Sequence, residues 1–166
     1  MHHILQYECF LVRLSPFGQF NDIQESDTID LYTYIIEELT KLPLAYVHFI
    51  RLRVIGNRDR EADKDGPCED RESAFENLVR SYPGVRILAG GYTAELAVRD
   101  TSPREGERPL ADLIAFGRRF TSNPDLVDRI RHGRSLRMYD RSTFYTNDEN
   151  GYTTYTRWSP EEEIVN

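Results

Sequence analysis

Four apolar segments, separated by stretches of helical or loop character, constrain the fold of this chain more than any other feature. They lie at 9–14, 44–50, 85–89 and 113–116, and each is apolar almost throughout rather than at every second residue. Runs of this kind are typical of parallel strands buried on both faces, and parallel neighbours need crossover connections that are usually helices. The pattern therefore predicts an α/β fold with about four βα units, which is half of an eight-unit barrel.

Helix and loop signals divide the rest of the chain. The segment 29–41 repeats apolar residues at helical spacing, and Asn123 followed by proline is typical of a helix start with asparagine as the N-cap. Residues 57–72 are dense in charged residues, glycine and proline, and they predict an exposed insertion. The chain beyond Gly133 is rich in tyrosine and threonine and predicts an irregular C-terminal tail. We expect 1–166 to form a single domain.

Composition and charge exclude several classes of partner. The net charge of −7 provides no overall field that attracts nucleic acid. No apolar run approaches the ~18 residues of a membrane-spanning helix. The two cysteines, Cys9 and Cys68, form neither a CxxC pair nor a disulfide framework, which suits a reducing compartment. We therefore expect a cytoplasmic protein with no nucleic-acid or membrane partner, and the sequence indicates no metal site.

Arginine is concentrated near the end of the predicted fold. Seven arginines lie between Gly117 and Arg141, against three acidic residues. The planar guanidinium group suits phosphate and carboxylate ligands better than the ammonium group of lysine does. The segment is open to two interpretations, an anion-binding region or a helix with a solvated, arginine-rich face.

Three features fall at the carboxyl ends of predicted strands, where α/β proteins form their sites. Arg13 stands in an apolar strand and needs an anionic or electron-rich partner, either a ligand or an internal ion pair. Gly90 and Gly91 end the third strand and allow the backbone to approach a phosphate closely. Gly117 and Arg118 end the fourth strand and add a charged donor. Glycines at the ends of the last two strands predict a phosphate site of the kind found in (βα) barrels.

These motifs occur in the order seen in the old yellow enzymes, and the chain from about Leu11 to Tyr155 resembles that family. Its members are FMN-dependent NAD(P)H dehydrogenases and ene-reductases, including 12-oxophytodienoate reductases. The resemblance implies a partial TIM barrel that corresponds to strands five to eight. The segments that carry it are Arg13-Leu14-Ser15-Pro16, Leu44-Ala45-Tyr46-Val47-His48, Ala89-Gly90-Gly91-Tyr92, Ala115-Phe116-Gly117-Arg118, Asn123-Pro124-Asp125-Leu126 and Tyr139-Asp140-Arg141-Ser142-Thr143-Phe144-Tyr145.

The resemblance also implies an activity and a set of contacts. The family transfers hydride from NAD(P)H through FMN to an activated alkene, so the implied substrate is a small α,β-unsaturated carbonyl compound. Arg13 resembles the arginine at the pyrimidine edge of the flavin ring, and Tyr145 resembles an aromatic residue that closes over the flavin and substrate, with rim packing as its alternative. The residues that resemble the phosphate site are Gly90, Gly91, Gly117 and Arg118.

The departures from the family pattern limit what can be expected. The His-x-x-Asn or His-x-x-His pair and the proton-donating tyrosine have no counterpart, so no catalytic residue is identified. Arg51-Leu52-Arg53 stands where many members have Glu-Pro-Arg, and the leader before Phe10 is dissimilar. These departures indicate a truncated or alternatively started product whose activity as an isolated chain is in doubt.

Two other functions remain open. The first is a non-catalytic half-barrel that acts as an interaction module, because its unpaired edges near 11–14 and 113–116 would invite a homodimer or a complementing half-barrel. The second is another phosphate-binding barrel enzyme, although the Arg-Leu-Ser-Pro and Tyr-Asp-Arg segments argue against it.

Overall fold

A computed structural model describes residues 10–18, 26–52, 54–55, 58–59, 69–104 and 106–160 of the chain. These residues belong to two compact units, Met1–Ala115 and Phe116–Asn166. Cys9, Cys68, Arg53 and most of the predicted insertion lie outside the described residues. The single domain expected over 1–166 stays a prediction.

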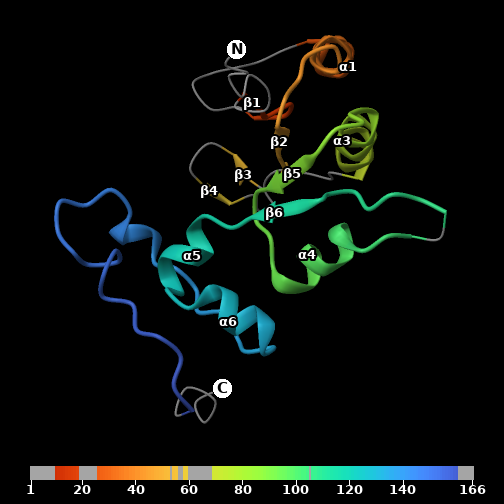
Figure 1. Ribbon diagram of the computed structural model, residues 1–166. Helices are drawn as coiled ribbons and strands as arrows, with labels where there is room; N and C mark the ends of the chain where they lie inside the picture. Colours follow the sequence, from red (N-terminus) through yellow and green to blue (C-terminus); the bar gives the residue numbers. More distant parts are fainter. Residues whose placement is uncertain are drawn as a thin grey trace, which may run out of the picture. The chain divides into compact units, whose positions relative to one another are not determined.

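A four-stranded parallel sheet forms the centre of the first unit (Figure 1). Its strands are β1 (Leu11–Leu14), β2 (Tyr46–Ile50), β5 (Arg86–Ala89) and β6 (Leu113–Ala115), in the order β1-β2-β5-β6. Every neighbouring pair is parallel. The predicted α/β fold is therefore confirmed, and each strand falls inside the apolar segment that predicts it.

Three helices connect these strands, and they lie on one side of the sheet in Figure 1. They are α1 (Thr28–Leu39), α3 (Glu69–Ser81) and α4 (Ala94–Thr101), with α1 packed against α3 and α4 near β6. The core takes alternate residues of β2 and β5 and the inner faces of α1 and α3. Its most completely buried apolar side chains are Ile36, Val47, Phe49, Phe75, Val79 and Leu88.

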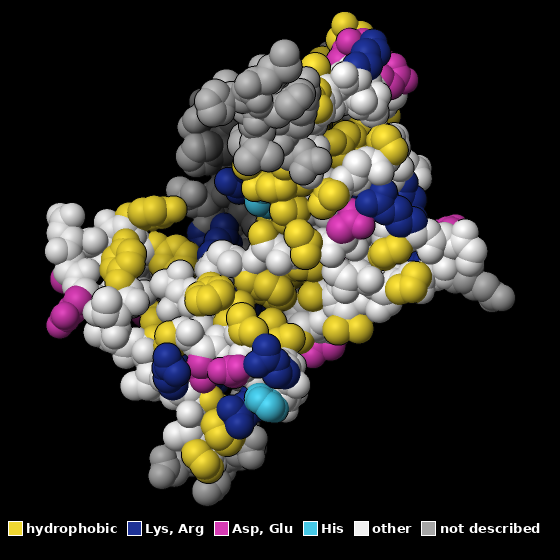
Figure 2. Space-filling model, viewed as in Figure 1, with side chains coloured by type: hydrophobic (Ala, Val, Ile, Leu, Met, Phe, Trp, Pro, Cys, Tyr) yellow, Lys and Arg dark blue, Asp and Glu magenta, His cyan; other side chains and the backbone are white. Residues whose placement is uncertain are grey.

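The two faces of the sheet are not equally buried, contrary to the prediction from the continuous apolar runs. One lateral row of paired residues runs from Arg13 through His48 and Ile87 to Leu113. In this row the two inner residues are half-buried and the two outer ones are exposed. The apolar character of these strands thus exceeds what the described residues bury, although parallel strands are usually covered on both faces. On the face that Figure 2 shows, apolar side chains reach the surface in the region of the sheet.

The predicted insertion at 57–72 is shorter than the sequence indicates. Two short strands, β3 (Val54–Ile55) and β4 (Arg58–Asp59), form an antiparallel pair, and α3 begins at Glu69. The acidic residues at 69–72 lie in the first turn of α3, where carboxylates stabilise a helix N-terminus. In the sequence alone, their charge favours an exposed loop.

The second unit contains α5 (Arg118–Ser122), α6 (Leu126–Arg131) and one 3-10 turn at Arg141–Thr143, and the irregular tail is confirmed beyond them. Helix α5 was not expected from the sequence. The prediction that Asn123 is an N-cap is wrong, because the N-cap residue of α6 is Asp125. The Asn123 side chain makes other contacts instead. Across the described parts of both units, no helix has the length and apolar character that crossing a membrane would require.

Candidate phosphate site and its surroundings

A turn of two glycines lies at the carboxyl end of β5. Gly90 and Gly91 have φ values of 106° and 67°, in the left-handed region that favours glycine. A Cβ atom on Gly90 would lie 3.2 Å from the backbone N and O of Arg51, so a side chain here would crowd the end of β2. Both the left-handed conformation of Gly90 and its close approach to Arg51 therefore favour glycine, whereas the approach to a phosphate stays a prediction.

The strand register aligns the carboxyl ends of three strands. Ile50 pairs with Ala89, and Ala89 pairs with Ala115, so β2, β5 and β6 end level with one another. The backbone N–H of Arg51 donates to the carbonyl of Ala89 at 2.8 Å and extends the pairing by one step. Gly90 directly follows Ala89 in the chain, and Gly117 follows Ala115 by two residues.

Arg13 projects from the half-exposed face of the sheet, beside His48 on the neighbouring strand. Its own side chain is exposed, and among the described residues it makes no ion pair. The internal ion pair that the sequence left open is therefore not seen in the described part of the chain. Burial, followed by the positive charge of Arg13, lowers the pKa of His48, so this histidine favours its neutral form.

A cluster of buried charges, which sequence reasoning missed, lies next to the glycine turn. Nη1 of Arg51 donates to the Tyr92 hydroxyl at 3.2 Å and forms an ion pair with Asp100, while Nη2 pairs with Glu72. The Tyr92 hydroxyl donates to Oδ2 of Asp100 at 2.8 Å. These side chains come from three parts of the sequence, because Tyr92 and Asp100 are only eight residues apart. The one local signal is Arg51 itself, an arginine directly after a buried strand.

The environment of this cluster shifts two of its pKa values. Burial raises the pKa of Tyr92, which keeps the hydroxyl protonated and able to donate. Burial alone would also raise the pKa of Asp100, but hydrogen bonds from Arg99 and Tyr92 and the charge of Arg51 hold it below its ordinary value. Asp100 is therefore ionised, and it is paired.

In the second unit, Gly117 is the N-cap residue of α5 and Arg118 is its first residue. A Cβ atom on Gly117 would meet no atom within 4 Å, so the backbone there borders open space. The Arg118 guanidinium lies over the ring of Tyr139, 5.9 Å from its centroid. The aromatic ring thus holds this arginine beside the glycine.

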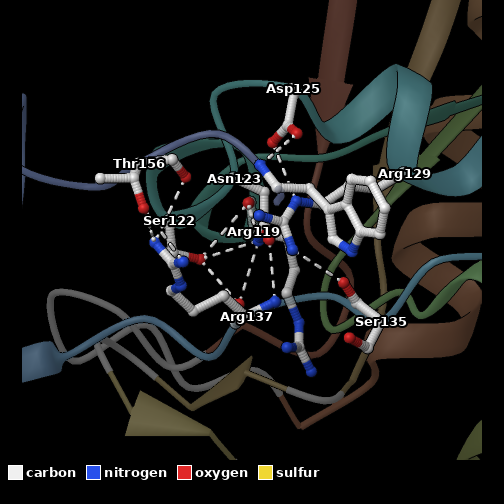
Figure 3. A network of polar contacts seen from close by, with 9 residues as sticks. Arg119, Ser122, Asn123, Asp125, Arg129, Ser135, Arg137 and Thr156 are labelled. Atoms are coloured by element: carbon white, nitrogen blue, oxygen red, sulfur yellow. Dashed lines mark hydrogen bonds and ion pairs between the residues drawn. The ribbon is translucent and has the colours of Figure 1, made fainter. Parts of the chain in front are cut away.

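Several of the other clustered arginines are held by contacts within the second unit, a structural use that neither interpretation of the segment includes. Nε of the fully buried Arg129 pairs with Oδ1 of Asp125 at 2.8 Å, and its Nη1 donates to the Ser135 carbonyl at 3.0 Å (Figure 3). Arg137 donates to Thr156. Arg134 lies over Trp158 at 3.7 Å. These contacts hold the irregular tail against α6.

Asn123 lies in the middle of the same network (Figure 3). Its Nδ2 donates to the carbonyls of Arg119 at 2.8 Å and Arg137 at 3.0 Å, and its Oδ1 accepts from the N–H of Arg137 at 2.8 Å. One buried amide thus joins α5 to the strand-like segment at 135–139.

Tyr145 combines exposure with an unusual backbone conformation. Its side chain is 85% exposed. Its φ is 60°, and among the described residues it is the one non-glycine residue with a positive φ. Its N–H donates to the Tyr152 hydroxyl at 2.7 Å, and the ring of Phe144 meets its ring edge-on at 6.4 Å. Local contacts therefore present this aromatic ring to solvent, in a conformation that is common where a site must be shaped.

Comparison with known proteins relates this chain to a family. A model of the NADH:flavin oxidoreductase / NADH oxidase family matches residues 2–137, a stretch that includes parts of both units. 12-Oxophytodienoate reductase 7 of Oryza sativa subsp. japonica is 37% identical over 150 residues, which cover 87% of this chain and 37% of the reductase. Flavin oxidoreductase hxnT of Emericella nidulans is 37% identical over 155 residues, which cover 87% of this chain and 39% of that protein.

Solved structures agree with the sequence matches. The old yellow enzyme from Trypanosoma cruzi superposes with a TM-score of 0.70 at 29% identity, over 90% of this chain and 35% of the enzyme. Morphinone reductase superposes with a TM-score of 0.69 at 30% identity, over 94% of this chain and 38% of the reductase. The chain thus spans little more than a third of the length of these relatives, and its fold corresponds to part of a TIM barrel.

Proposed function

This chain belongs to the NADH:flavin oxidoreductase / NADH oxidase family, and we propose that it binds FMN and serves the NAD(P)H-dependent reduction of activated alkenes. The observation that carries the proposal is the left-handed pair Gly90–Gly91 at the end of β5, beside the parallel strand that leads to Gly117. FMN and NAD(P)H are the cofactor and reductant implied by the family. The implied substrate is a small α,β-unsaturated carbonyl compound.

The residues of the glycine turn suit the FMN phosphate. Left-handed glycines turn successive backbone N–H groups toward one point, which forms a concave site for an anion. The resemblance to the family adds Gly117 and Arg118, and the guanidinium of Arg118 would supply a charge-assisted hydrogen bond. We assign the phosphate to Gly90, Gly91, Gly117 and Arg118.

Arg13 and Tyr145 suit the other parts of the ligand. When bound, FMN supplies the chemistry by accepting hydride from NAD(P)H and passing it to the alkene. Arg13 is exposed on the open face of the sheet, where its positive charge would stabilise negative charge on the flavin ring. Tyr145 would cover the ring and exclude water. No described residue is assigned as the proton donor, so the complete reaction calls for groups beyond those described.

Flavin titration tests this function. The purified chain, mixed with excess FMN and separated from free flavin, should retain a yellow absorbance. Arg118→Ala should weaken FMN binding by about 1.5–3 kcal/mol, the range for a charged hydrogen bond. Arg131→Ala is the matched control, because Arg131 is exposed and pairs with Asp128 instead. A chain that retains no flavin would refute the proposal, and an Arg118 variant with unchanged affinity would move the phosphate elsewhere.

A second function is favoured by the sheet edges. β1 and β6 are the outer strands, and Leu11 and Leu113 on them are 50% and 55% exposed. Parallel apolar edges invite pairing with further strands, so the chain could act as a half-barrel module that binds a second copy or a complementing half-barrel. Light scattering on wild type and Leu113→Lys tests this: association that the lysine abolishes supports it, and a monomeric wild type that remains folded contradicts it.

The proposed location is cytoplasmic. The support is the cysteine content, since the two cysteines, Cys9 and Cys68, make no disulfide framework of the kind typical of secreted proteins.

A further inference from the structure

A buried hydrogen-bond network links the chain on both sides of the Gly90–Gly91 turn. Arg51 donates to the Tyr92 hydroxyl at 3.2 Å, and that hydroxyl donates to Asp100 at 2.8 Å. Arg51, Tyr92 and Asp100 are only 5%, 3% and 1% exposed, so water does not compete for these bonds. The network therefore connects Tyr92, which follows the two glycines, to Arg51 at the end of β2 and to Asp100 in α4.

Arg51 also holds the other side of the turn. Its backbone N–H donates to the carbonyl of Ala89 at 2.8 Å, directly before the glycines, and its backbone lies within 3.2 Å of a Cβ position on Gly90. Adjacent glycines have more backbone freedom than any other pair of residues. A turn made of them keeps one conformation only if the residues on both sides are anchored, and here one arginine contacts both.

The charges of the network are balanced, which keeps the arginine in place. Arg51 forms ion pairs with Asp100 and Glu72, and Nε of Arg99 donates to the second oxygen of Asp100 at 2.8 Å. A buried guanidinium is costly unless it is paired, and removing one charged partner would destabilise the whole unit. Removing the Tyr92 hydroxyl leaves every ion pair intact, so it is the mildest way to loosen the turn.

We infer that Arg51, Tyr92 and Asp100 are positioning residues that hold the Gly90–Gly91 turn in the conformation that receives the FMN phosphate. The inference rests on the proposed function for its ligand. The residues act through the turn: they orient its N–H groups before the ligand arrives, which reduces the ordering required on binding.

The comparison of FMN with riboflavin isolates the phosphate contribution, because the two share the flavin ring and differ in the phosphate group. Dissociation constants for both are measured by fluorescence quenching on wild type and Tyr92→Phe. The variant should bind FMN about threefold to tenfold more weakly, the net contribution of one hydrogen bond, and should bind riboflavin as wild type does. Equal weakening for both flavins, or no change for FMN, would overturn the inference.

Hydrogen–deuterium exchange provides a readout that needs no flavin. The N–H groups of residues 89–93 should exchange faster in Tyr92→Phe than in wild type. Tyr82→Phe is the matched control, because Tyr82 is also buried but precedes β5, at the opposite end of the strand; it should change neither exchange at 89–93 nor the ratio of the two affinities. Unchanged exchange in Tyr92→Phe overturns the inference whatever the flavin result. A wild type that binds neither flavin overturns the proposed function, and exchange alone then decides whether the network holds the turn.

Discussion

Asn123→Ala tests whether one buried amide holds the second unit together. The Asn123 side chain is fully buried and makes hydrogen bonds to the backbones of Arg119 and Arg137. Alanine removes both the donor and the acceptor and leaves a small space. The polar groups around that space then lose their hydrogen bonds to Asn123. Only a water molecule that enters the unit would replace these bonds.

The magnitude follows from the bonds that are lost. The Arg137 carbonyl keeps its bond from Oγ of Ser122 at 2.9 Å. The Arg119 carbonyl keeps only a long contact of 3.4 Å with the same hydroxyl, and the Arg137 N–H loses its bond to Asn123. Two buried groups therefore lose a hydrogen bond, at about 1–3 kcal/mol each, and partial relaxation gives about 2–4 kcal/mol in all. The folded fraction relative to the unfolded one should fall about 30- to 900-fold.

Trp158 provides the assay, because it is the one tryptophan of the sequence and its backbone N–H donates to Oδ2 of Asp125 in the same network at 2.8 Å. Urea unfolding followed by its fluorescence should show a lower midpoint for Asn123→Ala, with an unchanged slope. Asn147→Ala is the matched control, since Asn147 is exposed in the same unit. The reasoning would be refuted if Asn123→Ala lowered the free energy of unfolding by less than about 0.5 kcal/mol, the usual range for a surface substitution, or by no more than Asn147→Ala does.

Two further predictions concern the first unit. Burial, and then the charge of Arg13, lowers the pKa of His48 from 6.5. The neutral imidazole therefore contributes to stability above pH 6.5, and this contribution is lost as the pH falls through the lowered pKa of His48 in the folded protein. His48→Gln should flatten the fall of the unfolding free energy below pH 6.5, and an unchanged slope would contradict this. Gly106→Ala should cost about 1–2 kcal/mol for its positive φ alone. Gly90→Ala should cost more, because its Cβ also crowds the backbone of Arg51; equal losses in thermal unfolding would show that the close approach is unimportant.

The elements of the first unit were predictable because their signals are local. A continuous apolar run interrupted by glycine or proline indicates a buried parallel strand, and β1, β2, β5 and β6 all lie within such runs. The glycines after β5 were also predictable as a turn, since few residues other than glycine adopt positive φ there. The insertion was misjudged because the acidic residues at 69–72 suit both an exposed loop and a helix N-terminus.

The burial of each charged residue was not predictable, because it depends on how the folded chain packs around the side chain. Arg129 and Arg131 lie on the same short helix, yet the first is fully buried and the second is exposed. The difference arises because Arg129 meets Asp125 on one side and the Ser135 carbonyl on the other. Each arginine follows an aspartate by three or four residues, so this spacing alone does not tell which of the two is buried.

The sequence by itself determined the four parallel strands of the first unit, the glycines that follow two of them and the family. Tertiary structure alone decided which face of the sheet is covered, that Asn123 joins two segments instead of capping a helix, and that Arg51 meets Tyr92, 41 residues away, and Asp100, 49 residues away. The reason is physical. Backbone conformation responds to neighbouring residues, whereas a buried polar group is stable only where folding brings its partners within hydrogen-bond distance.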